Sequence, residues 1–202
     1  MNESILLELN RSLGKFNFSR RGQSFSFSRS NDFGRDNIHV GFSREGVHGY
    51  FALDVSIRIQ DIENAINALK DDISEADSYA TATIGCSLSI LDSSIPNRWS
   101  LDVDFNQVDT AIENIAMPFF SKYRKIDDIL SVLLNDSSES WKLCPLHSSR
   151  AIKAVEMALQ YQGERFAKGV IDLKRQFFEK ISDPNAIFFE DYLVKRGLCG
   201  SW

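Results

Sequence analysis

Cysteine, histidine and proline are scarce in this chain, and the few that occur exclude several kinds of site. The 202 residues include three cysteines, three histidines and four prolines. The cysteines are odd in number and far apart, so they indicate no disulfide framework. No Cys-x-x-Cys or His-Glu-x-x-His motif is present, and no two histidines have the spacing of paired metal ligands. We therefore expect no metal site.

The glycine-rich motifs of phosphate and dinucleotide binding are also missing. The chain has no Gly-x-x-x-x-Gly-Lys-Ser/Thr loop, no Gly-x-Gly-x-x-Gly after a strand and no Gly-x-Ser-x-Gly turn. These absences predict that the protein has no cofactor, and they favour a function other than catalysis. An enzyme of unrecognised class remains an alternative, because catalytic groups are often scattered along a chain.

Long hydrophobic runs and an excess of basic residues are lacking too. No stretch approaches the roughly 20 apolar residues of a membrane span, and the first residues carry acids where a signal peptide carries basic residues. We expect a cytoplasmic protein that binds no membrane. The net charge of −5 argues against a nucleic-acid surface, which needs clustered lysine and arginine.

The clearest structural signal is the strict alternation of apolar and polar residues over 51–60, which predicts a strand with one buried face. Four other segments alternate in the same way. The five predicted strands are 24–28, 38–42, 51–60, 81–90 and 99–105. Patterning on one side favours an antiparallel sheet with one solvated face.

Helical periodicity marks 4–13 and 61–73, and it continues from residue 106 to the C-terminal end. Asp61 is the expected N-cap of its helix, and Pro118 should end or kink the helix that contains it. Polar turns or loops are expected at 30–37, 43–49, 71–77 and 135–149.

The predicted fold is α+β, and it has two parts. Residues 1–105 should form an antiparallel sheet of about five strands with helices on one face, followed by an all-helical part, 106–202. No linker rich in proline, glycine and serine separates the two parts. We therefore expect the helical part to pack on the sheet as one compact unit.

Acidic residues are concentrated in one segment, 45–105, whose net charge is −8. An acidic surface attracts a basic protein partner electrostatically. The side chains expected to form this surface are Asp71, Asp72, Glu75, Asp77, Asp102 and Asp104. The last two share the outward face of one predicted strand, where two carboxylates could instead share a metal or a proton, or simply discourage edge pairing.

One further pair has the residue types of acid–base chemistry. Asp36 lies three residues before His39, and a carboxylate beside an imidazole can relay a proton. The alternation of 38–42, however, places His39 on the solvated face of its predicted strand.

Several motifs in residues 1–135 resemble a bacterial family known as domain-of-unknown-function family 4304. Phe18 and Gly22-Gln23-Ser24-Phe25 resemble its Phe-x-x-x-Gly-x-x-Phe motif. Ile84-Gly85, Trp99 and Pro118-Phe119-Phe120 are similar to later positions of the family. The resemblance implies a first helix that leads into a strand, and it implies no catalytic residues.

These features favour a small bacterial protein that acts by binding another protein, in the specific form of an immunity-type or accessory factor that masks its partner. A second alternative is a scaffold that binds peptides in a groove of its C-terminal helices, where two helical segments meet at Gly163. The sequence leaves the oligomeric state open.

Overall fold

The computed structural model describes residues 2–198, which form two compact units. The first unit contains the described residues up to Arg58 together with Ile84–Arg124. The second contains Ile59–Thr83 and the described residues from Lys125 onward. The chain after residue 106 is thus shared between the two units, and the packing of one predicted part on the other stays a prediction.

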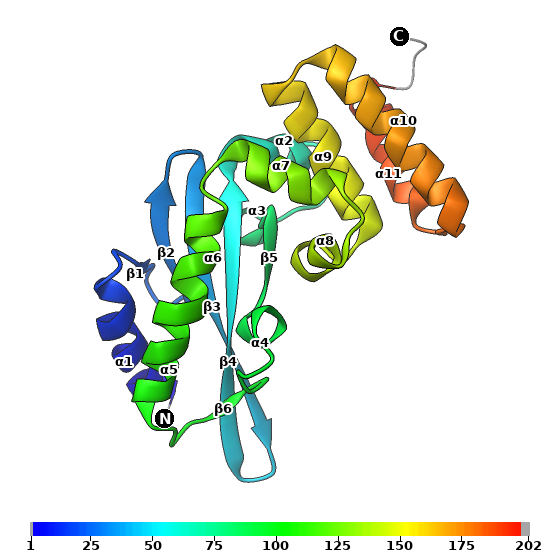
Figure 1. Ribbon diagram of the computed structural model, residues 1–202. Coiled ribbons are helices and arrows are strands. Elements are labelled where there is room, and N and C mark those ends of the chain that lie inside the picture. The colour runs from blue at the N-terminus through cyan, green and yellow to red at the C-terminus, as the bar shows by residue number, and fades with distance from the viewer. Residues whose placement is uncertain (1, 199–202) are drawn as a thin grey trace. The chain divides into compact units, whose positions relative to one another are not determined.

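The first unit is built on an antiparallel six-stranded sheet (Figure 1). The strands run in the order β1-β2-β3-β4-β5, and β6 also pairs with β4. Their bounds are β1 Ser19–Arg20, β2 Ser26–Asn31, β3 Gly34–Glu45, β4 His48–Ile59, β5 Ile84–Ser87 and β6 Trp99–Ser100. The predicted α+β class is confirmed. The two-residue strand β1 is too short for its pattern to be visible in the sequence.

The core of this unit lies between one face of the sheet and its helices. Phe51, Leu53, Val55 and Ile57 of β4 are each at most 1% exposed, as their alternation predicted. The helices are α1 Asn2–Gly14, α4 Leu88–Leu91, α5 Phe105–Ala111, the π-helical segment η1 Ile112–Ala116 and α6 Met117–Lys122. In Figure 1, α5 and α6 form one nearly continuous helix in front of the strands.

Pro118 does not end this helix, because the backbone widens before it. Proline has no N–H for the carbonyl four residues earlier, and its ring crowds that carbonyl. The five residues of η1, which directly precede α6, adopt π-helical geometry, and a wider turn of this kind tolerates the missing hydrogen bond. The helix then continues to Lys122.

Two predicted strands are much shorter in the structure because they share one edge of β4. β5 pairs with Asp54 to Ile57, and β6 pairs with Tyr50 and Phe51. β5 cannot extend past Ser87 along an edge that β6 occupies, so residues 88–91 turn into α4. β6 ends at Ser100 because β4 itself begins at His48. The strand predictions 81–90 and 99–105 were therefore too long.

The second unit is helical. Its elements are α2 Gln60–Asn67, α3 Glu75–Ala80, α7 Ile126–Leu134, α8 Ser138–Leu143, α9 His147–Tyr161, α10 Glu164–Ile181 and α11 Ala186–Lys195. α9 is the central helix, since α2, α7, α10 and α11 all pack against it. Its small and apolar residues Ala151, Ala154, Val155 and Ala158 are fully buried, which allows close packing on several sides.

Several local predictions were wrong. The turn expected at 30–37 is a two-residue hairpin turn, because β2 and β3 extend to Asn31 and from Gly34. The loops expected at 71–77 and 135–149 contain the short helices α3 and α8, each capped by a serine side chain. Ile59, not Asp61, occupies the N-cap position of α2, and Asp61 lies in the first helical turn.

Candidate functional site

Four of the six predicted acidic residues lie together in the second unit. Asp71 and Asp72 follow α2, and Glu75 and Asp77 belong to α3; all four are exposed. Asp71 accepts a hydrogen bond from Lys195 Nζ at 3.0 Å. Asp77 is part of a cap, since its carboxylate accepts from the Ser74 hydroxyl at 2.7 Å. Asp72 and Glu75 make no side-chain hydrogen bond to any other residue that the structure describes.

The other two acidic residues lie in the first unit and have local structural roles. Neither is on a strand, which corrects the prediction that they share one strand face. Asp102 lies in the turn after β6 and accepts from the Ser100 hydroxyl, a hydrogen bond that lowers the pKa of its carboxyl. Asp104 is the N-cap of α5 and accepts from Asn106 N at 3.1 Å.

Asp36 and His39 do not form the pair that their spacing suggested. Successive side chains of β3 point to opposite faces of the sheet, so residues three apart lie on different faces. Asp36 is buried beside Ile38, whereas His39 is exposed and shares a hydrogen bond of 2.9 Å with the Ser26 hydroxyl.

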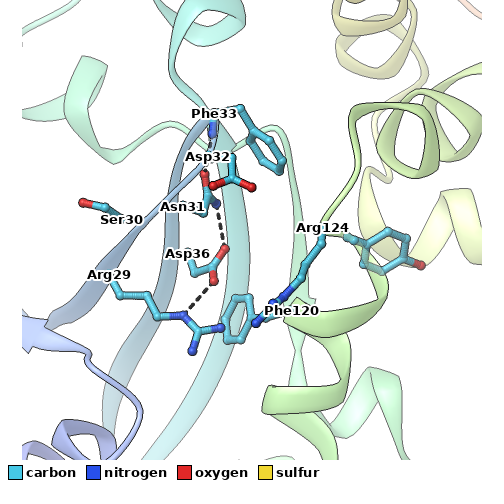
Figure 2. Close-up of a pocket in the computed structure, with 9 residues that line it drawn as sticks. Arg29, Ser30, Asn31, Asp32, Phe33, Asp36, Phe120 and Arg124 are labelled. Atoms are coloured by element: carbon cyan, nitrogen blue, oxygen red, sulfur yellow. Dashed lines mark hydrogen bonds and ion pairs between the residues drawn. The ribbon is translucent and has the colours of Figure 1, made fainter.

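A polar cavity of about 200 Å³ lies in the first unit, between the β2–β3 turn and the end of α6 (Figure 2). The Asp36 carboxylate forms part of its wall. It accepts hydrogen bonds from Arg29 Nε and Asn31 Nδ2, each at 2.8 Å. Arg29 is further fixed by the Phe16 carbonyl at 3.2 Å and lies over the Phe18 ring at 4.6 Å. This ion pair is therefore satisfied within the protein.

The opposite wall of the cavity comes from α6 and the residues that follow it. Phe120, Tyr123 and Arg124 line the cavity there, and Asp32 and Phe33 line it at the hairpin turn. In Figure 2, Arg124 extends toward Phe120, while Asp32 lies at the tip of the turn. The cavity thus combines aromatic rings with charges of both signs.

An apolar groove of about 540 Å³ lies in the second unit, along the exposed side of α10. Its lining residues are Leu134, Gln162, Arg165, Phe166, Gly169, Val170 and Leu173. Phe166 and Leu173 are 43% and 49% exposed, which is high for large apolar side chains. The sequence shows these positions as an ordinary helical stripe and gives no sign that one side of it is uncovered.

A third cavity, of about 410 Å³, lies beside α2 and the start of α9. Lys153 lines it, but its ammonium is used by the fold. Lys153 Nζ donates to the Ala82 carbonyl at 2.5 Å and lies 3.7 Å from the buried Glu63 carboxylate. The Thr83 hydroxyl donates to the same carboxylate at 3.0 Å. These contacts hold the 59–83 segment against α9.

A buried carboxylate joins α9 to α11. Glu156 is fully buried and accepts hydrogen bonds from the Tyr192 hydroxyl at 2.5 Å, Arg196 Nε at 3.0 Å and Gln160 Nε2 at 3.0 Å. Burial by itself would raise the pKa of Glu156, but the donated hydrogen bonds and the Arg196 charge outweigh it and lower that pKa. Burial and the same carboxylate raise the pKa of the Tyr192 hydroxyl.

A second buried cluster joins three elements of this unit around Asp136. Arg150 Nη2 and Lys174 Nζ approach the Asp136 carboxylate at 2.6 Å and 3.3 Å, and both cations are almost fully buried. Arg150 Nη2 also lies 2.8 Å from His147 Nδ1, and the imidazole packs between the rings of Trp141 and Phe177. Burial and the Arg150 charge lower the pKa of His147.

None of these clusters has the composition of a metal site. Within residues 2–198, no group of three or more histidine, cysteine, aspartate and glutamate side chains is placed to hold a metal ion. Among the same residues, no helix is long and apolar enough to cross a membrane.

Comparisons of the chain with protein-family models, with curated proteins and with solved structures find no match. The resemblance of residues 1–135 to domain-of-unknown-function family 4304 stays a prediction.

Proposed function

We propose that the protein acts by binding another protein, and that the contact surface is the apolar groove of α10 in the second unit. The observation that carries this proposal is the groove itself, an uncovered concave surface whose wall is made of large apolar side chains. Exposed apolar surfaces of this kind cost solvation free energy and are typical of sites that a partner covers.

The floor of the groove has a glycine where a helix would ordinarily have a side chain. Glycine within a helix is about 1 kcal/mol less favourable than alanine. A Cβ atom at Gly169 would meet nothing within 4 Å, so packing inside the protein does not require glycine there. The missing side chain instead leaves room for an apolar residue of a partner, between Phe166 and Leu173.

The proposed occupant is an amphipathic helix of the partner protein. Apolar residues three and four positions apart on such a helix fit an apolar groove. Arg165, at the rim, is exposed and forms no ion pair with any residue in 2–198. We expect the partner helix to place an acidic residue opposite this guanidinium.

The acidic residues of the second unit supply a second, electrostatic part of the contact. The first unit has eleven basic and eleven acidic side chains, whereas the second has twelve basic and seventeen acidic, so the whole net charge of −5 lies in the second unit. Asp72 and Glu75 have no structural partner among the described residues and are available to a basic region of the partner. An immunity-type or accessory factor that masks its partner would use such a surface.

The groove is tested by capture of a specific partner from native cells on the immobilised full chain, with the captured protein identified by mass spectrometry. Leu173→Asp places a charge in the groove, and Gly169→Leu fills it. Leu7→Asp is the matched control, because Leu7 is also exposed but belongs to α1 of the first unit. We expect both groove variants to lose the wild-type partner and Leu7→Asp to retain it. Retention of that partner by both groove variants would refute the proposed surface.

The acidic part is tested by titrating the identified partner at low and high salt. Asp72→Lys with Glu75→Lys should weaken binding at low salt and reduce its salt dependence, because the two exposed charges act through solvent. Glu113→Lys with Glu179→Lys changes the net charge equally at other exposed positions and is the control. Equal weakening by both pairs would show that net charge, not this surface, is what matters.

A further inference from the structure

The cavity of the first unit contains two charged side chains that the fold does not use. Arg124 and Asp32 both line it. Within residues 2–198, neither side chain forms a hydrogen bond or an ion pair, and they form none with each other. Opposite charges that line one cavity without touching leave both groups available to a molecule placed between them.

We propose that this cavity binds a small zwitterion, a metabolite that carries a carboxylate or phosphate group and a protonated amine. The Arg124 guanidinium would hold the oxyanion, because its planar set of N–H donors matches two oxygens at once. The Asp32 carboxylate would accept hydrogen bonds from the ammonium group.

The rest of the wall explains why a zwitterion fits better than a simple anion. Arg29 and Asp36 neutralise each other at 2.8 Å, and both are held in place by further contacts. The remaining charges, one positive and one negative, also cancel. A simple anion bound at Arg124 would leave the Asp32 carboxylate unbalanced within the same cavity, whereas a zwitterion satisfies both groups.

The size and the apolar part of the cavity limit the ligand further. About 200 Å³ is smaller than the ~300–1,000 Å³ of sites for drug-sized molecules, so the ligand is of the size of an amino acid. Phe33, Phe120 and Tyr123 supply aromatic surface between the two charged groups. An aliphatic or flat portion of the ligand would pack there.

The test is binding of defined probes to the full chain, measured by thermal shift and then by calorimetry. The probes are the standard amino acids, 4-aminobutyrate and ethanolamine phosphate, which differ in the separation of their two charges. Acetate and inorganic phosphate serve as anions without an amine. At least one zwitterion should raise the unfolding temperature in a concentration-dependent way.

Arg124→Gln and Asp32→Asn should each weaken binding of that probe, by roughly tenfold or more, because each removes a charge-assisted hydrogen bond. Both variants should fold, since neither side chain has a partner among the described residues. Arg165→Gln, which removes an exposed arginine of the second unit, should change nothing.

Three results would overturn the proposal. The first is that no zwitterion stabilises the wild-type protein. The second is that Arg124→Gln binds as tightly as wild type. The third is that acetate or phosphate stabilises the protein as well as any zwitterion and that Asp32→Asn has no effect, which would mark a site for oxyanions alone. None of these outcomes bears on the groove of the second unit, so the two proposals fail independently.

Discussion

Replacing Gly85 by alanine should destabilise the first unit, because β4 and β5 come closest at this residue. Gly85 pairs with Ser56 across the two strands. A Cβ atom on Gly85 would lie 2.6 Å from both Ser56 Cβ and the Val55 carbonyl oxygen. The obstacles are main-chain atoms and a Cβ atom, which cannot rotate away, so the strands themselves must move apart.

The size of that movement gives the expected loss of stability. Ordinary contact begins near 3.4 Å, so the new methyl group is about 0.8 Å too close. Strands that separate by this amount stretch hydrogen bonds of ~2.9 Å to ~3.7 Å, beyond their normal range. Forced overpacking costs about 1–3 kcal/mol, and one or two weakened hydrogen bonds add about 1 kcal/mol each. We expect a total loss of about 2–4 kcal/mol, or roughly 4–16 °C in unfolding temperature.

Gly41→Ala is the matched control, because Gly41 also lies in a strand and a Cβ atom there would meet nothing within 4 Å. That variant should be neutral or up to about 1 kcal/mol more stable, since alanine restricts the unfolded chain. Urea denaturation followed by circular dichroism measures both variants. Equal stability of Gly85→Ala and Gly41→Ala would refute the close approach of β4 and β5.

The two buried clusters of the second unit give further predictions. Glu156→Gln should lower stability at neutral pH by about 2 kcal/mol, because the amide leaves the Arg196 charge unbalanced; urea denaturation beside the exposed control Glu179→Gln measures this, and equal stability of the two would contradict it. His147 has a lowered pKa in the folded protein, so the unfolded chain binds more protons below about pH 6.5 and stability should fall as the pH drops from there. His147→Gln should reduce this loss between pH 7.5 and 5, and an unchanged pH profile would show that other groups cause it.

The sequence was most informative where burial depends on local periodicity. Phe51 to Ile57 alternate strictly, and the structure buries one side of them in the centre of the sheet. The helical stripes after residue 106 likewise became packed helices. Such patterns survive because a strand or helix buries the same face whatever covers it.

Predictions that depended on distant residues were less successful. The length of β5 depends on β6, which lies later in the chain and occupies the adjoining part of the β4 edge. Asp102 and Asp104 lie off the strand for the same reason, because β4 begins too late to pair with them. The cavity could not be foreseen either, since Asp32 and Arg124 belong to separate elements and only the fold brings them to one cavity.

The 59–83 segment is, topologically, the loop of a β-hairpin. Ile57 and Ile84 are paired neighbours in β4 and β5, yet the 25 residues between Arg58 and Ile84 belong to the other compact unit. A tight hairpin would join these strands with two residues. Closing a loop of this length costs roughly 2 kcal/mol more in chain entropy, at about 0.6 kcal/mol for each doubling. The pairing of β4 with β5 is therefore expected to form late in folding, after α2 has docked on α9 and shortened the effective loop.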